Sequence, residues 1–213
     1  CIFASNTSAL PIKEIAKASS RPETVIGMHY FSPVPKMPLL EIIVTDQTAD
    51  WVTATCFELG IRQGKTCIVV KDGPGFYTTR ILAPFMNEAL LLMDEGADAL
   101  HVDRTMKKFG FPVGPITLMD EVGIDVGAHI MSGELVKEFV EKREDAKISE
   151  GLKKMFDAGY HGRKNKKGFY KYDENGKKIS GQINTDVYQY FGGSDCKKFD
   201  DEEIQQRMGM IMV

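Results

Sequence analysis

Residues 25–44 read VIGMHYFSPVPKMPLLEIIV and carry one histidine, His29, and one glutamate, Glu41, inside two apolar runs. Both runs have the β-branched and apolar composition of buried strands. The short connection between them contains three prolines, which suits a link between neighbouring antiparallel strands better than a helical crossover. The stretch therefore predicts a strand pair across which His29 and Glu41 meet.

The predicted pair has a chemical reason to exist. A buried carboxylate without a partner would cost several kcal/mol or would become neutral, so Glu41 requires a partner close by. A carboxylate bound to one nitrogen of His29 would fix its tautomer and raise the basicity of the other nitrogen, as in a general base. A core histidine in a structural ion pair explains the same residues equally well.

Composition limits the function classes. The chain has 213 residues, 43% of them hydrophobic, and a formal net charge of −3, which argues against a nucleic-acid partner. No run approaches the roughly 20 apolar residues of a membrane span. The four cysteines, at positions 1, 56, 67 and 196, lack CxxC or metal-ligand spacing. They predict reduced thiols and no metal site.

The order of patterns predicts α/β structure followed by all-α structure. Strand-like runs in residues 1–71 alternate with a helix opened by Pro11 as its first residue and a helix over residues 50–59, and TCIVVK is the last strand. Helical periodicity begins at Tyr77. We expect a first domain over residues 1–71, a helical domain over 72–172, and a hairpin end, a linker and the start of a second helical domain over 173–213.

Turn and capping residues divide the helical part. Asp98 or Asp103 is expected to begin one helix, Ser149 or its neighbour another, and the glycines at 123 and 127 loosen a third. Asn175-Gly176 predicts a two-residue hairpin turn in which both residues have positive φ. The residues between this hairpin and Asp200 have the composition of a linker.

The chain ends suggest a piece of a longer protein. The sequence begins at Cys1 in an apolar run and ends on EEIQQRMGMIMV, an amphipathic helical pattern without a C-cap. The expected sheet would then have an uncovered edge, and we expect the chain to self-associate.

Three polar patches could carry chemistry. SNTS, residues 5–8, lies between a predicted strand and a predicted helix, where hydroxyl groups cap helices or bind ligands. DGPGFYTTR, residues 72–80, combines glycines for close backbone approach with two threonines. GRKNKKGFYKY, residues 162–172, has five cations that could hold a phosphate group, although solvated surface is the simpler interpretation.

Together and in order, these phrases carry a family resemblance. SNTSALPI, GMHYFSPV with KMPLLEII, IVVKDGPGFYTTR, KFGFPVGPITLMDEVGID and GRKNKKGFYKY closely resemble L-3-hydroxyacyl-CoA dehydrogenases. FSP after the histidine, FYTTR and the GFPVGPITLMDEVG phrase are similar to the multifunctional α-subunits of fatty acid β-oxidation, a branch that includes the mitochondrial trifunctional enzyme.

The resemblance implies roles for individual residues. His29 matches the general base that takes the 3-hydroxyl proton, and Glu41 matches the carboxylate that orients it. Ser8 matches a serine near both substrate and nicotinamide. The resemblance implies a cofactor contact for Ser32 and a substrate contact for Thr79. Both positions are asparagine in the monofunctional enzymes, so the polar contacts that serine and threonine make there stay open.

The resemblance also implies a fold and a cofactor. It predicts the C-terminal part of a Rossmann-type NAD-binding domain followed by the helical C-terminal domain of the family, with NAD as oxidant of an (S)-3-hydroxyacyl-CoA. The sequence has no GxGxxG turn. We therefore expect the phosphate-binding half to lie upstream and the isolated chain to be inactive.

Partners and location follow from the same branch. The full-length protein is expected to carry an enoyl-CoA hydratase domain, to bind a thiolase β-subunit and to work in the mitochondrial matrix, or in the cytoplasm of a bacterium. Two alternatives stay open: a packing or dimerisation module without catalysis, and a related two-domain dehydrogenase acting on sugar acids.

Overall fold

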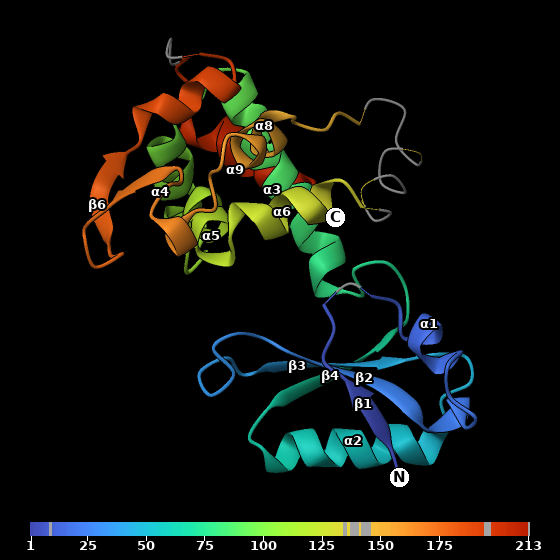
Figure 1. Ribbon diagram of the computed structural model, residues 1–213. Coiled ribbons are helices and arrows are strands. Elements are labelled where there is room, and N and C mark those ends of the chain that lie inside the picture. Colours follow the sequence, from blue (N-terminus) through green and yellow to red (C-terminus); the bar gives the residue numbers. More distant parts are fainter. Residues whose placement is uncertain (9, 134–135, 137–140, 142–145, 194–196, 213) are drawn as a thin grey trace. The chain divides into compact units, whose positions relative to one another are not determined.

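The computed structural model describes residues 1–213 except 9, 134–135, 137–140, 142–145, 194–196 and 213. The chain forms two compact units, Cys1–Arg80 and Ile81–Val213 (Figure 1). The first is α/β and the second is mainly helical, which confirms the predicted change of class.

The first unit is built on a four-stranded mixed sheet. Its strands are β1 (Phe3–Ser5), β2 (Val25–Tyr30), β3 (Leu39–Val44) and β4 (Thr66–Lys71), hydrogen-bonded in that order. β2 and β3 are antiparallel, whereas β1 with β2 and β3 with β4 are parallel. The proline-containing connection therefore links two neighbouring antiparallel strands, as predicted.

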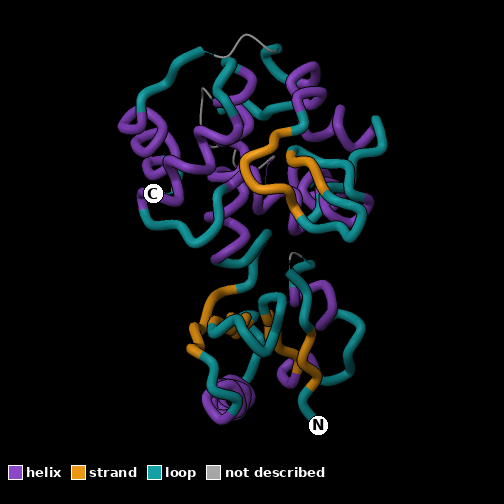
Figure 2. Tube along the Cα trace, turned by 90° about the vertical axis from the view of Figure 1, so that its left-hand side faces the viewer, coloured by secondary structure: helices purple, strands orange, loops and turns teal. Residues whose placement is uncertain are grey.

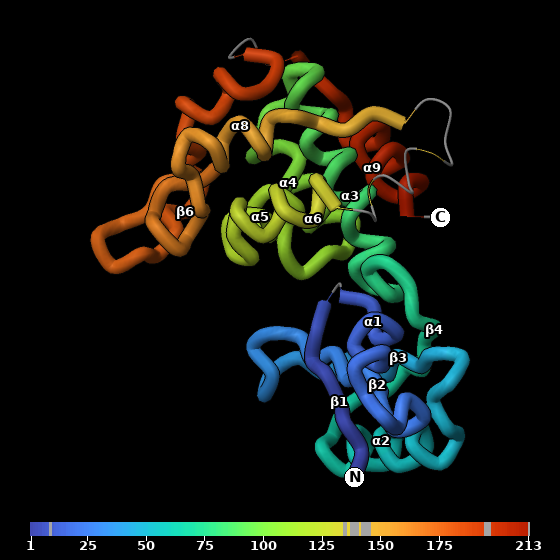
Figure 3. Tube along the Cα trace, turned by 45° about the vertical axis from the view of Figure 1, so that its right-hand side comes forward, coloured from blue at the N-terminus to red at the C-terminus, as the bar shows by residue number. Residues whose placement is uncertain are grey.

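Helices cover both faces of this sheet, as Figures 1 and 3 show. α2 (Asp50–Arg62) packs Val52 and Cys56 on the face that carries Ile26 and Ile42. α1 (Ile12–Ala16) packs on the opposite face, with a buried cluster made of Ile12, Ala16, Val25, Ile43 and Phe76. His29 and Glu41 alternate with the α2-facing residues of their strands, so the pleat turns them toward the α1 face.

Two details of these helices differ from prediction. α2 continues to Arg62, three residues beyond the expected end. Pro11 precedes α1 as its N-cap, with ψ 133°, and is not its first helical residue. The free amides at the start of α1 are instead bound by Asp72, whose carboxylate accepts hydrogen bonds from Ile12 N at 2.9 Å and Lys13 N at 2.8 Å.

The second unit combines helices with one hairpin, and Figure 2 shows its strands among the helices. After Arg80 it continues α3 (Thr78–Asp94), the helix within which the two units divide. The other described elements are α4 (Ala99–Phe109), α5 (Pro115–Val122), α6 (Ile124–Met131), α8 (Gly151–Asp157), η2 (Arg163–Asn165), β5 (Tyr170–Tyr172), β6 (Lys178–Ile183), η3 (Thr185–Tyr190) and α9 (Asp201–Met210).

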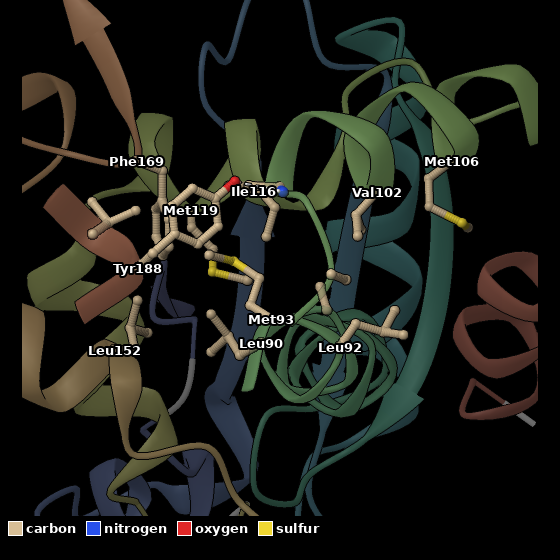
Figure 4. Packing of buried hydrophobic residues seen from close by; sticks show 14 of the residues in the cluster. Leu90, Leu92, Met93, Val102, Met106, Ile116, Met119, Leu152, Phe169 and Tyr188 are labelled. Atoms are coloured by element: carbon tan, nitrogen blue, oxygen red, sulfur yellow. Dashed lines mark hydrogen bonds between the residues drawn. The ribbon is translucent and has the colours of Figure 1, made fainter. Parts of the chain in front are cut away.

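Among its described residues, one large hydrophobic cluster forms the core of this unit. Leu90 and Met93 of α3 contribute to it together with Val102 of α4, Phe169 before β5 and Tyr188 of η3 (Figure 4). All except Tyr188, which is 6% exposed, are fully buried. Segments almost 100 residues apart in the chain therefore share one core.

The predicted caps are largely confirmed. Asp98, rather than Asp103, begins α4, because its carboxylate accepts a hydrogen bond from His101 N at 2.7 Å. At α8 the N-cap is the neighbour, Glu150, whose side chain makes no cap hydrogen bond, while Ser149 Oγ accepts from Gly151 N at 3.2 Å. Gly123, with φ 110°, divides the loosened helical pattern into α5 and α6.

Two expectations for the end of the chain are wrong. In the turn of the hairpin Gly176 has a positive φ, 74°, but Asn175 does not, so Asn175-Gly176 is not a turn with two left-handed residues. The expected linker contains η3, whose Val187 is fully buried in the core. Ile204 and Met208 of α9 belong to the same core.

Candidate active site

His29 and Glu41 form a buried pair in the first unit. Their Cα atoms are partners in the register of β2 and β3, so both side chains leave the same face of the sheet. His29 Nδ1 lies 2.6 Å from Glu41 Oε2. Glu41 is fully buried and His29 is 7% exposed. The predicted contact between the two strands is thus confirmed.

The second carboxylate oxygen of Glu41 is held by the backbone. Glu41 Oε1 accepts hydrogen bonds from Thr78 N at 2.8 Å and from Tyr77 N at 3.2 Å, at the start of α3. Burial by itself raises the pKa of Glu41, but the hydrogen bonds from His29 and Thr78 outweigh it and hold the pKa below its ordinary value. The carboxylate is therefore ionised at neutral pH.

Aromatic rings surround the imidazole of His29. Its ring centroid lies 4.4 Å from that of Phe31 and 6.2 Å from that of Phe76. Within the described residues, Nε2 of His29 has no hydrogen-bond partner, whereas Nδ1 is bound to the carboxylate. This arrangement fixes the proton on Nδ1 and leaves a basic Nε2, which is the form that a general base requires.

Two of the other predicted site residues lie together. Ser8 is exposed and follows β1, and its carbonyl oxygen accepts a hydrogen bond from Thr79 Oγ1 at 3.4 Å. Asn6, in the same loop, accepts from Tyr30 N at 2.9 Å, which ties this loop to the end of β2. Ser32 is also exposed, but it lies in the loop after β2 and the structure gives its side chain no contact with the other predicted residues.

Sequence reasoning missed the backbone donors to Glu41. The amides of Tyr77 and Thr78 carry no signature in side-chain type. The one available signal is the GPGF turn just before them, since its glycines mark a backbone with unusual conformation.

The basic patch of residues 162–172 is largely satisfied by the protein itself. Lys164 Nζ bonds Asp125 at 2.8 Å, and Lys167 Nζ bonds the carbonyl of Ala158 at 3.0 Å while lying over the Tyr160 ring. These contacts favour the surface interpretation over a phosphate site.

The described residues show no metal site. They contain no group of three His, Cys, Asp or Glu side chains placed to hold a metal ion. Cys1, Cys56 and Cys67 are free thiols, and Cys196 lies outside the described residues. Among the described helices, none is long and apolar enough to cross a membrane.

Two family models match the sequence in succession. Residues 1–73 match the NAD-binding domain of 3-hydroxyacyl-CoA dehydrogenase, and residues 75–172 match the C-terminal domain of 3-hydroxyacyl-CoA dehydrogenase. Neither model describes a dehydrogenase of sugar acids, so that alternative is not supported.

Curated relatives are similar along the chain. The fatty acid oxidation complex subunit alpha of Idiomarina loihiensis is 55% identical over 88% of this chain, and that of Shewanella halifaxensis is 51% identical over 100%. The chain spans only about a quarter of these relatives, 26% and 29% of their lengths. Both sources are bacteria, so the expectation of a mitochondrial location is not supported.

Solved structures share the fold. The (S)-3-hydroxybutyryl-CoA dehydrogenase of Ralstonia eutropha has a TM-score of 0.74 and 38% identity, covering 81% of this chain and 61% of that one. The dehydrogenase part of multifunctional enzyme 1 from C. elegans has a TM-score of 0.64 and 29% identity, covering 98% and 46%.

Proposed function

We propose, because this chain belongs to the 3-hydroxyacyl-CoA dehydrogenase family, that His29 and Glu41 perform the acid-base step of a 3-hydroxyacyl-CoA dehydrogenase. The reaction is the reversible oxidation of an (S)-3-hydroxyacyl-CoA to a 3-ketoacyl-CoA. The observation that supports this proposal is the 2.6 Å contact between His29 Nδ1 and a fully buried, ionised Glu41.

The protein's part in the step is proton transfer. His29 Nε2 takes the proton of the 3-hydroxyl group as the C3–O single bond becomes a carbonyl, and it returns the proton in the reverse direction. Glu41 stabilises the imidazolium that forms, and its fixed position means that little reorganisation accompanies the charge. NAD, when bound, supplies the acceptor for the hydride that leaves C3.

The residues present fit one end of that cofactor. The loop after β1, with Asn6 and Ser8, lies at the carboxyl end of a strand, where ligands of open α/β sheets bind. The sequence lacks the GxGxxG turn that would hold the pyrophosphate. We therefore assign Ser8 to the nicotinamide end only, and the assignment of Ser32 to the same end is supported by the family resemblance alone.

Substrate contacts are assigned to Ser8 and Thr79. Their mutual hydrogen bond joins the loop after β1 to the first turn of α3, the helix whose start holds Glu41. The hydroxyl of Ser8 can donate to, or accept from, the oxygen at C3 of the substrate, and the hydroxyl of Thr79, whose proton goes to Ser8 O, can accept from the 3-hydroxyl group.

The full-length protein is proposed to be the α-subunit of a bacterial fatty acid oxidation complex, in the cytoplasm. The names and lengths of the curated relatives support this reading. An enoyl-CoA hydratase domain and a thiolase β-subunit partner belong to the same proposal. Co-purification of the full-length protein with a thiolase subunit would test the partner.

The test of the chemistry uses the full-length protein. Glu41→Gln should lower kcat for acetoacetyl-CoA reduction much more than it raises KM, because the carboxylate acts in the chemical step. His29→Gln should lower kcat further. Glu58→Gln, which removes an exposed carboxylate of α2 that pairs with Arg62, is the matched control. Full turnover in both site variants would contradict the assignment and favour a packing module.

A further inference from the structure

The start of α3 forms a binding site for the carboxylate of Glu41. α3 is 17 residues long, and Thr78 is its first residue. The first amides of a helix have no acceptor within the helix, and the helix dipole favours a negative charge there. Thr78 N and Tyr77 N both point at the same oxygen, Glu41 Oε1, at 2.8 and 3.2 Å.

An unusual backbone conformation aims these amides. Phe76 N donates to Gly73 O at 3.1 Å to close a turn, and both Gly75, with φ 70°, and Phe76, with φ 49°, are left-handed. A positive φ is a rarity for a bulky residue, and such strain concentrates at functional sites. Phe76 is 4% exposed and its ring lies beside His29. One turn thus directs amides to Glu41 and a ring to His29.

The two oxygens of Glu41 have separate tasks. Oε1 accepts hydrogen bonds from the amides of Tyr77 and Thr78, and Oε2 binds His29 Nδ1. The terminal torsion of a glutamate is soft, so a carboxylate held by His29 alone could rotate away from the position that orients the ring. The amides remove this freedom.

We propose that Thr78 is a positioning residue of the dehydrogenase, which acts through its backbone amide by anchoring Glu41 Oε1 so that Oε2 holds the imidazole of His29. This inference rests on the function proposed above. The hydroxyl of Thr78 is buried but makes no hydrogen bond within the described part of the chain, so the amide is the group that holds Glu41.

Thr78→Pro tests the amide directly. Proline lacks the N–H group and is tolerated in the first turn of a helix, so the helix should persist. In the 213-residue chain, a ¹³C NMR titration of the Glu41 carboxyl should show a higher pKa than in the unchanged chain, because one donor to the carboxylate is gone. In the full-length enzyme, kcat should fall about tenfold while KM stays within about twofold.

Two variants separate the amide from other effects. Asp50→Pro places proline at the first residue of α2. The preceding residue, Ala49, has ψ 145°, a conformation that a following proline allows, so this variant controls for the general effect of a proline at a helix start. Thr78→Val removes the hydroxyl and keeps the amide, so its effect on kcat and on the Glu41 titration should be much smaller than that of Thr78→Pro. Thermal melts of all three variants verify that the unit is folded.

The outcomes distinguish this inference from the proposed function. The inference is overturned if Thr78→Pro behaves like Asp50→Pro in both measurements, if Thr78→Val is equally damaging, or if the titration moves while kcat does not. The proposed function fails by a different result, which is full turnover in the His29 and Glu41 variants. The NMR titration needs no turnover, so it reports on the anchor even then.

Discussion

Glu41 of the first unit is a buried, hydrogen-bonded carboxylate and also a residue of the proposed acid-base pair. It is fully buried, yet three donors reach its two oxygens, His29 Nδ1 and the amides of Tyr77 and Thr78. Truncating one partner of such a buried pair is expensive, because the remaining groups lose their partner without regaining water. The stability of the first unit and the proposed chemistry of Glu41 therefore depend on the same contacts.

The lowered pKa of Glu41 predicts a pH-dependent cost for Glu41→Gln. A carboxyl whose folded pKa lies below its unfolded value adds stability above the unfolded value, and that stability is lost as pH falls through the folded value. Glu41→Gln should thus cost about 2 to 4 kcal/mol at pH 7, and the cost should shrink as the pH falls below the ordinary glutamate pKa of 4.5. Urea unfolding measures this loss of stability in the first unit. It can be followed by the fluorescence of Trp51, the single tryptophan, which lies in α2. An equal cost at both pH values would contradict an ionised native Glu41.

At the residue scale, the sequence was sufficient for the pair but not for its anchor. A lone His and a lone Glu in two apolar strands predict each other because a buried charge needs a partner. The backbone donors could not be predicted, because they depend on a left-handed Phe76, a conformation that its side chain disfavours.

Short helices of this protein depend on partners from distant elements. α1 has five residues, too few for a helix to be stable by itself, and its free amides are bound by Asp72, which follows β4. Asp72→Ala should destabilise the first unit by about 0.5 to 2 kcal/mol. Urea unfolding followed by Trp51 fluorescence tests this, with Asp46→Ala, an exposed aspartate, as the control. Equal stability of the two variants would show that the cap is dispensable.

α5 is joined to the β5–β6 hairpin by a second buried carboxylate. Asp120 accepts hydrogen bonds from Phe169 N at 2.9 Å, Tyr170 N at 3.0 Å and the hydroxyl of Tyr172 at 2.9 Å. Burial raises the pKa of Asp120 to about 6, although these donors oppose the shift. The pKa of Asp120 is shifted in the opposite direction from that of Glu41, because at Asp120 the effect of burial exceeds that of the hydrogen bonds.

The raised pKa of Asp120 has a defined consequence for stability. Between about pH 4 and 6 the folded state binds more protons at this site than the unfolded state, so this group makes stability fall as pH rises through that window. Asp120→Asn should remove this fall and also destabilise the unit by about 1 to 3 kcal/mol, since the amide cannot accept all three donors. Melting curves at 222 nm across this window measure both effects. The exposed neighbour Glu121→Gln is the control, and an unchanged slope in Asp120→Asn would contradict the assignment.

Elements with strong local patterns were predictable, and elements that depend on distant packing were not. The four strands and the cap at Asp98 follow from alternation and capping chemistry. The composition around the 3-10 helix η3 predicts a linker, and only the core shared with α3 and α4 explains why Val187 is buried. The hairpin turn differs from the predicted one because the carboxylate of Asp173 accepts hydrogen bonds from the turn, including one from Lys177 N at 2.8 Å.

At the scale of the whole molecule, the class of each unit follows from the period of its hydrophobic pattern. The change from strand to helical periodicity near residue 72 predicts an α/β unit followed by a helical one, and the structure has both. The bounds assigned to the three predicted domains stay predictions. Periodicity alone does not predict that β2 and β3 are antiparallel within a Rossmann-type sheet. The prolines of the short connection between them predict that direction.

The outer strands of the first unit predict self-association of this chain. In the described structure β1 pairs only with β2 and β4 only with β3, so each has one edge without a strand partner. Exposed apolar side chains accompany them, with Phe3 of β1 58% and Val69 of β4 47% exposed. Open strand edges with apolar side chains pair with other chains unless charges block them.

Charged substitutions on these strands should therefore reduce the association. Light scattering at tens of micromolar should give a mass above 23.8 kDa for the unchanged chain and a lower mean mass for Phe3→Lys combined with Val69→Lys. Val122→Lys combined with Val126→Lys, which adds the same two charges at exposed valines of α5 and α6, should keep the mass of the unchanged chain, because neither residue lies on a strand. A monomeric unchanged chain would remove the argument from open edges, and equal effects of the helix and strand variants, which add the same charge, would assign association to net charge instead.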